Sequence, residues 1–247
     1  IADFRSRWRR QVSPNAAAVR RAIVGRTITR LSRRGKFIVL QLDTGDGLLV
    51  HLRMSGRFEW TNGRSSTATH VRAVWNFEDG HRLLLCDARK FGRIIHTHDL
   101  AGSTRALGPE PLGRAFTVDA LAKLLEARSR RIKPLLLDQT VIAGLGNIYT
   151  DEALFRAGVH PLTHANGLRR AAVARLHGAI REVLREGIRR NGTSIDWIYP
   201  EGRMQEYLRV YGRAGAPCVT CGTPIIALRV AQRGTHICPS CQPASFA

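Results

Sequence analysis

A pair of Cys-x-x-Cys motifs near the end of the chain constrains its fold more than any other feature. Cys218 and Cys221 precede a sixteen-residue stretch, and Cys238 and Cys241 follow it. Four thiolates in two close pairs match the tetrahedral ligand set of structural zinc. Two disulfides or four free thiols are the alternatives. Zinc is favoured because the chain has five cysteines and no other cysteine cluster.

The stretch between the two motifs is predicted to form a β-hairpin. "TPIIALRV" is rich in branched residues, "AQRG" is able to turn, and "THIC" returns to the second motif. A structural zinc ion stabilises a segment that is too small for a core of its own. The predicted hairpin would hold Arg233 near its tip. Cys86, in "LLLCDAR", is interpreted as a small buried apolar residue.

Charge narrows the class of binding partner. The chain of 247 residues has 39 Lys and Arg against 19 Asp and Glu, a formal net charge of +20. With 44% hydrophobic residues it has enough apolar side chains for one or two cores. The arginines are spread along the whole sequence, which favours a polyanion, above all nucleic acid, as the partner. Charge alone does not separate DNA from RNA, and a protein of RNA assemblies is an alternative.

Two patterns divide the chain. Roughly the first hundred residues alternate like short strands, with turns at "DTGDG" and "EDG", and predict a β-sandwich. "VSPNAAAVRRAIVG" is typical of a short helix. "LGPEPLGRAF" breaks the pattern, and helical spacing follows, with Thr117 as a possible N-cap and a long amphipathic helix ending in Asn-Gly. The predicted class is α+β, with domains at 1–112, 117–206 and 207–247.

"DQTVIAGLGNIYTDEALFRAGVHP" lies between these helical segments. Asn147 is predicted to cap a helix that carries Asp151 and Glu152 in its first turn and ends at Gly158. The glycines before it let the backbone approach a ligand, and free N–H groups at a helix start bind anions such as phosphate. A plain tight turn is the alternative for this segment.

Taken together, these segments resemble the formamidopyrimidine-DNA glycosylases, which are base-excision repair enzymes related to endonuclease VIII. "RRGKFIVLQL", "HLRMSG", "DARKFG", "LGPEPL" and "LRVYGRAGAPCVTCGTPI" also match, in the family's order. The resemblance implies an N-terminal β-sandwich and a C-terminal helical domain with a helix-two-turn-helix and a zinc β-hairpin. It also implies one structural Zn²⁺ and damaged duplex DNA bound in the cleft between the domains.

The resemblance also implies roles for single residues. Arg233 and Asn147 would hold phosphates at the lesion, and Lys36 would lie near them and assist strand cleavage. Met54, Arg89 and Phe91 would fill the gap left by an everted base, because an unstacked hole needs a wedge of apolar and planar groups. Arg89 would also hydrogen-bond the orphaned base. Arg128 and Lys133 match further phosphate contacts.

Two positions depart from the family pattern. Ala68 stands where the family usually has a histidine, so one DNA contact is expected to be missing or replaced. The family's nucleophile is an N-terminal proline followed by a glutamate, whereas this chain opens with "IADFRSRWRR". We expect the chain to be a fragment of a protein with that start. A homologue without its catalytic residues is the alternative.

The expected function is removal of oxidised purines (8-oxoguanine and formamidopyrimidines) from duplex DNA, with strand cleavage by β,δ-elimination at the abasic site. We expect a monomer in the bacterial cytoplasm. A zinc-containing DNA-binding protein without catalytic activity is the alternative.

Overall fold

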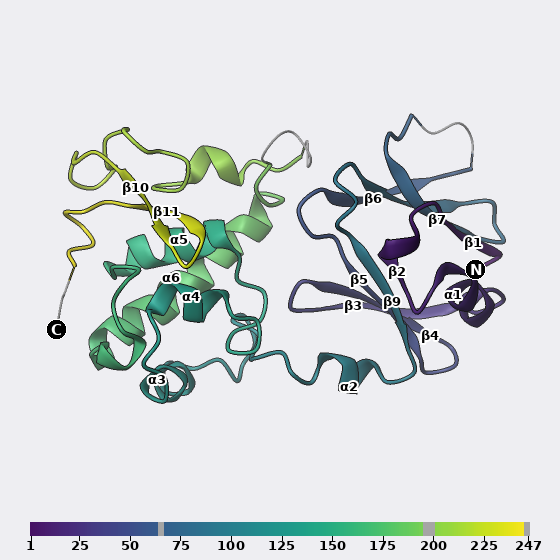
Figure 1. Cartoon of the computed structure of the whole chain (residues 1–247), viewed down its shortest axis with the longest axis horizontal. Helices are drawn as coiled ribbons and strands as arrows, with labels where there is room; N and C mark the ends of the chain where they lie inside the picture. Colours follow the sequence, from purple (N-terminus) through teal and green to yellow (C-terminus); the bar gives the residue numbers. More distant parts are fainter. Residues whose placement is uncertain (64–66, 195–200, 245–247) are drawn as a thin grey trace. The chain divides into compact units, whose positions relative to one another are not determined.

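The computed structural model describes residues 1–63, 67–194 and 201–244, and it divides the chain into two compact units. Unit 1 is Ile1–Ala106 and unit 2 is Leu107–Ala247 (Figure 1). The segment "LGPEPLGRAF", with two prolines and two glycines, opens unit 2. Within the described residues, no helix is long and apolar enough to cross a membrane.

Unit 1 consists mainly of two β-sheets. Within its described residues, one sheet has the order β1 (Asp3–Ser6), β7 (Val71–Asn76), β8 (Arg82–Asp87) and β6 (Gly56–Thr61). The other has the order β2 (Val12–Ser13), β9 (Arg93–Thr97), β5 (Gly47–His51), β4 (Phe37–Leu42) and β3 (Ile28–Arg34). Neighbouring strands are antiparallel except for the short β2–β9 pair. Helices α1 (Ala16–Ile23) and α2 (Leu100–Thr104) complete the unit.

A shared apolar core holds the two sheets together. Phe4, Trp75 and Leu85 of the four-stranded sheet are buried with Leu48 and Ile94 of the five-stranded one. Val19 and Ile23 bring α1 onto the same core. The predicted turns and the short helix are where the sequence placed them, and Asn15 caps α1 by accepting from the Ala18 N–H at 2.9 Å. The predicted sandwich is confirmed.

The described residues of unit 2 combine α-helices with a small hairpin. Its helices are α3 (Val118–Glu126), α4 (Ile132–Leu137), α5 (Asn147–Ala157) and α6 (Arg170–Arg189), and its strands are β10 (Ile226–Val230) and β11 (Arg233–Ile237). Thr117 caps α3 as predicted, accepting from the Ala120 N–H at 3.1 Å. Gly158 ends α5 in the left-handed conformation, also as predicted.

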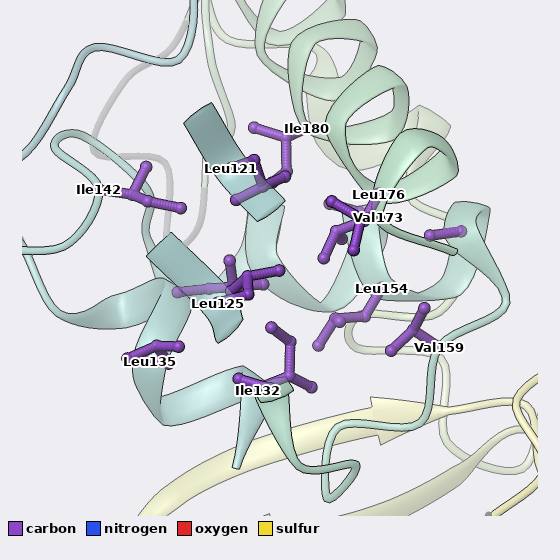
Figure 2. Packing of buried hydrophobic residues seen from close by; sticks show 14 of the residues in the cluster. Leu121, Leu125, Ile132, Leu135, Ile142, Leu154, Val159, Val173, Leu176 and Ile180 are labelled. Carbon is purple, nitrogen blue, oxygen red and sulfur yellow. The ribbon is translucent and has the colours of Figure 1, made fainter. Parts of the chain in front are cut away.

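The helices of unit 2 pack around one apolar core. Leu121 and Leu125 of α3, Ile132 and Leu135 of α4, Leu154 of α5 and Leu176 and Ile180 of α6 point into it (Figure 2). Most helical stability in proteins comes from burying one apolar face in this way. The core therefore fixes the starts of α4 and α5, on which the hairpin lies.

Candidate nucleic-acid interface and zinc site

The four predicted zinc ligands converge. The sulfur of Cys221 lies 3.5 Å from those of Cys238 and Cys241, and the sulfurs of Cys218 and Cys241 are 3.9 Å apart. Tetrahedral zinc with bonds of about 2.3 Å needs its sulfurs about 3.8 Å apart. All four cysteines are free thiols. The cluster therefore fits one structural zinc ion, as the spacing predicted.

The zinc site closes the open end of the β10–β11 hairpin. The two strands pair in register from Ile226 with Ile237 to Val230 with Arg233. Ala231 and Gln232 form the two-residue turn, both with positive φ (46° and 63°), as a type I′ hairpin turn requires. Arg233 follows directly and is exposed. The hairpin thus presents a guanidinium at the end opposite the metal.

A second attachment, independent of zinc, fixes the hairpin next to Arg233. The Asn147 side chain, at the start of α5, donates to the Gly234 carbonyl at 3.0 Å. Lys133 of α4 donates to the same carbonyl at 3.0 Å and to the Thr235 hydroxyl at 2.8 Å. Arg233 and Asn147, which lie 86 positions apart in the sequence (233 − 147 = 86), are therefore brought to one place.

Lys133 is part of a buried ion pair. Its ammonium lies 2.5 Å from the Asp151 carboxylate, and both side chains are fully buried. The other Asp151 oxygen accepts from the His236 N–H at 3.0 Å, so the pair also holds β11. Burial raises the pKa of Asp151 and lowers that of Lys133, because each charge loses its water, and their mutual attraction opposes both shifts.

Glu152, the next residue, anchors the segment that leads to the zinc motifs. Its buried carboxylate accepts from the N–H groups of Arg209, Val210 and Tyr211 at 2.9–3.0 Å. Phe155 of α5 packs with Val210 and with the zinc-site residues Cys218 and Cys238. One face of α5 thus supports both the hairpin and the segment that leads to the zinc motifs.

The start of α5 differs from the prediction in two ways. Gly146 is the N-cap, and Asn147 is the first helical residue, with no side-chain cap. Asp151 and Glu152 lie beyond the first turn and point inward. Asp151 accepts from a backbone N–H of the hairpin, and Glu152 from backbone N–H groups of the segment that leads to the zinc motifs, so neither caps its own helix. The side chain of Asn147 is therefore used to bind β11.

In unit 1, Met54, Arg89 and Phe91 lie on two adjacent loops. Asp87, fully buried at the end of β8, accepts from the Ser55 hydroxyl of one loop and from the Gly92 N–H of the other at 2.7 Å. The Ser55 hydroxyl also accepts from the Arg89 N–H at 3.1 Å.

The three side chains themselves are accessible. Met54 is 58% exposed and Phe91 47%, and the Arg89 guanidinium lies 5.6 Å from the centre of the Phe91 ring. Large apolar groups presented together at the surface mark a binding surface more often than a packing accident. Met54 and Phe91 therefore lie at the surface and do not belong to the core of unit 1.

Lys36 lies in the turn between β3 and β4 and is exposed. His51 pairs with Phe37 across the β4–β5 ladder. It therefore lies close to Lys36, the residue before Phe37. Burial, together with the positive charges of Arg53 and Lys36, lowers the pKa of His51 to about 4. His51 is therefore neutral at pH 7, while Lys36 and Arg53 form an electropositive surface suited to phosphate.

Arg128 and Lys133 differ from the other candidates. Arg128 is partly buried and donates to the Leu124 carbonyl at 2.8 Å, which satisfies a carbonyl near the end of α3. Lys133 is fully buried, with Asp151, Thr235 and Gly234 as its partners. Its ammonium is not accessible to a phosphate, so the expected direct contact is not supported. Lys133 instead positions the residues next to Arg233.

Asp87 and Ser55 were not singled out from the sequence. Both lie in stretches used for the resemblance, "DARKFG" and "HLRMSG", but each reads as an ordinary loop polar residue until the fold buries it. A weak signal was present: an aspartate directly after the apolar run "LLLC" must find partners if the strand end is buried.

Comparisons with known protein families agree with this arrangement. Residues 1–94 match the formamidopyrimidine-DNA glycosylase N-terminal domain, and residues 107–198 match the H2TH domain of the same proteins. Residues 215–244 match a zinc finger found in these glycosylases and in isoleucyl-tRNA synthetases.

Single proteins give the same picture. A formamidopyrimidine-DNA glycosylase of Herpetosiphon aurantiacus is 44% identical over 227 residues, which cover 90% of this chain and 83% of that protein. One of Moorella thermoacetica is 45% identical over 225 residues, covering 88% and 82%. The Lactococcus lactis enzyme, solved in complex with abasic-site DNA, superposes with a TM-score of 0.91 at 34% identity, over 99% of this chain and 92% of that one. The chain belongs to the formamidopyrimidine-DNA glycosylase family.

Proposed function

We propose that this protein removes oxidised purines from duplex DNA and cuts the strand at the resulting abasic site. Family membership supports DNA repair by base excision. Similar solved structures contain DNA with a formamidopyrimidine lesion, with carbocyclic 8-oxoguanine or with an abasic site, at 34–35% identity to this chain. The choice of lesion and the cleavage step are the parts that need an experiment.

The attachment of Arg233 to the start of α5 carries the proposal. An exposed guanidinium lies one residue from Gly234, whose carbonyl is bound by both Asn147 and Lys133. A fixed guanidinium and the first N–H groups of a helix are both suited to a phosphate oxygen. A flipped nucleotide strains the backbone at its own phosphates, so an anion site held this firmly favours the extruded state.

Unit 1 supplies the other half of the proposed readout. When a base leaves the stack, the duplex has a hole that water fills poorly. Met54 and Phe91 provide exposed apolar groups for it, and Arg89 provides a planar fork of donors for the unpaired base. Asp87 holds both loops, so these groups enter as one preformed wedge.

The proposed cleavage proceeds through a covalent imine. An amine attacks C1′ of the sugar, the glycosidic bond breaks, and the base leaves as a proton is delivered to it. The sugar ring then opens by cleavage of the C1′–O4′ bond, with a proton taken up by O4′, which gives the protonated imine. Loss of a C2′ proton then expels the 3′ phosphate, and loss of a C4′ proton expels the 5′ phosphate. Only an imine acidifies the C2′ proton enough for this elimination. The resemblance assigns the attack to an N-terminal proline.

Among the amines of this chain, two bear on that assignment. The α-amino group of Ile1 donates to the Arg26 carbonyl at 2.8 Å. Lys36 is exposed beside the electropositive surface. An ordinary lysine, with a pKa near 10.4, is almost wholly protonated at neutral pH and needs its site to activate it. We therefore propose that Lys36 assists cleavage rather than attacking.

Incision of defined duplexes tests the function. We expect a chain that carries the family's proline start to cut duplexes carrying 8-oxoguanine or formamidopyrimidine, and to be trapped on them by borohydride. Arg233→Ala should lower incision by roughly 100- to 1,000-fold, the usual effect of removing one preorganised charged donor. Arg229→Ala, on the exposed face of β10 in the same hairpin, is the matched control and should lower it less than about threefold.

The outcomes separate the alternatives. Duplex binding without incision or trapping would favour a DNA-binding homologue without catalytic activity. The 247 residues by themselves should bind duplex DNA. If borohydride traps them as efficiently as a chain that carries the proline start, the assignment to proline is wrong and Lys36 becomes the nucleophile.

Arg89→Ala should reduce the discrimination between lesion-containing and undamaged duplex more than it reduces the affinity for duplex DNA. Arg89 acts only after a base has left the stack, whereas many other arginines contact phosphates along the whole duplex. We expect the ratio of lesion to undamaged-duplex affinity to fall about tenfold, and affinity for undamaged duplex to change less than about threefold. Equal losses on both duplexes, measured by fluorescence anisotropy at one salt concentration, would make Arg89 an ordinary phosphate contact.

We further propose that the protein acts as a monomer in the bacterial cytoplasm. The relatives described above are bacterial proteins, and the substrate is the bacterial chromosome. A mass of one chain by light scattering at micromolar concentration tests the first part.

A further inference from the structure

A cluster of two histidines and an aspartate lies at one end of the five-stranded sheet in unit 1. Asp46 is in the turn between β4 and β5, His96 is on β9, and His98 follows that strand directly. Gly47 pairs with Thr97 and Leu48 with His96, so the next step along the ladder sets Asp46 opposite His98. Residues two apart on a strand share a face, which brings both imidazoles to the same carboxylate.

The three side chains offer one ligand atom each in a small volume. One Asp46 oxygen lies 2.7 Å from Nε2 of His96 and 3.5 Å from Nδ1 of His98. The three ligand atoms all lie within 4.8 Å of one another. A tetrahedral zinc ion with bonds of 2.0–2.1 Å requires its ligand atoms about 3.4 Å apart. The Asp46–His98 distance already meets this value, and the His96 contact meets it once its shared proton is displaced.

From this geometry we propose that Asp46, His96 and His98 form a second metal site, for a divalent transition metal of the zinc type. Two imidazoles and one carboxylate form a common protein ligand set for zinc, with the fourth position left to water. The site is separate from the four cysteines, since it lies in unit 1 and contains no sulfur.

The surroundings suit a bound ion that remains reachable from solvent. Asp46 and His96 are nearly buried, with side chains 11% and 7% exposed, whereas His98 is 87% exposed. The hydroxyl of Thr44 bonds the second Asp46 oxygen and so orients the carboxylate. Hydrogen-bonded outer partners of this kind are typical of metal sites.

Two arginines determine which fourth ligand the proposed metal ion favours. Arg21 and Arg26 line a cavity of about 400 Å³ together with Thr44, Asp46 and His98. Among the described residues, the ion-pair partners of Asp46 are the two histidines and neither arginine. The arginines oppose a bare cation, but they favour a metal whose fourth ligand is an anion such as hydroxide or chloride.

The ion would join two separate parts of unit 1: the β4–β5 turn and the end of β9. Metal that binds the folded state alone adds stability that grows with the logarithm of the free metal concentration. The expected consequence is a metal-dependent rise in the unfolding temperature of unit 1, with no change at the hairpin.

Cobalt titration of the full chain loaded with a single equivalent of Zn²⁺, which the four cysteines take first, tests the site. Tetrahedral Co²⁺ absorbs in the visible, and Co²⁺ on thiolates adds intense near-ultraviolet bands, so the spectrum separates the two sites. We expect one further equivalent of Co²⁺ with visible bands and no thiolate bands. Zn²⁺ should displace it, as the Irving–Williams order places zinc above cobalt.

Variants connect that equivalent to the named residues. His98 is exposed, so the His98→Ala variant should fold normally. Both His98→Ala and Asp46→Asn should weaken the affinity for the second equivalent of Co²⁺ at least about tenfold. His81→Ala is the matched control, because His81 pairs with Asp79 at 3.0 Å without a second histidine, and it should leave binding unchanged. Binding of one metal only, or a second equivalent that survives His98→Ala unchanged, would overturn the proposal.

Discussion

Cys238→Ala should lower the zinc content of the purified chain by about one equivalent relative to the unmodified chain, and lower lesion incision at least roughly 100-fold. The four sulfurs are spaced for one ion, and structural zinc supplies an apparent 10–16 kcal/mol to small domains of this kind. The apolar group around them, Phe155, Val210, Cys218, Ile225 and Cys238, is too small to replace it. Without the metal, the hairpin no longer holds Arg233 in a fixed position.

Cys86→Ala is the control for the loss of a buried thiol. Cys86 is fully buried in unit 1 and is not a ligand of the cluster. It should keep its zinc and most of its activity, at a cost of about 1 kcal/mol for the small cavity. Elemental analysis and incision measured on the same preparations decide the matter. A Cys238→Ala chain with the same zinc content as the unmodified chain would show that the ligand set is wrong.

Asp151→Asn should destabilise unit 2 by about 3–5 kcal/mol. The substitution keeps the shape of the side chain and an acceptor for the His236 N–H. It removes the charge that faces Lys133, which is fully buried and would be left unpaired. The urea midpoint, followed by far-ultraviolet circular dichroism, reports on unit 2 because α3, α5 and α6 lie there. Incision should fall as well, since the same pair holds β11 beside Arg233.

A double variant separates the charge effect from the loss of contacts. Lys133→Met combined with Asp151→Asn removes both charges at nearly constant volume, and should be more stable than Asp151→Asn alone, because an apolar replacement of a buried pair is often neutral or stabilising. Equal stability of the two would mean that the buried ammonium finds another partner. Incision by the double variant should remain low, because the bonds from Lys133 to Gly234 and Thr235 are lost.

Much of the architecture was predictable because it depends on residues close together in the sequence. The spacing of the four cysteines identified the zinc ligands, since each Cys-x-x-Cys pair binds through its own local turn. Thr117 and Gly158 marked helix ends through bonds and backbone angles set within one turn. The alternating runs before residue 100 predicted the sandwich because the side-chain period of a strand is local.

By contrast, only tertiary structure decided which charges are buried and what they hold. Lys133 matched a phosphate-binding residue in the sequence, yet it is fully buried beside Asp151 and bonds Thr235, which is 102 residues away. The place of Asp87 after an apolar run indicated that it needs partners, but not that it would join the loops carrying Met54 and Arg89, because its partner Ser55 lies 32 residues earlier. A buried polar group must find a partner, but the partner is chosen by how the chain packs, and sequence neighbours do not specify it.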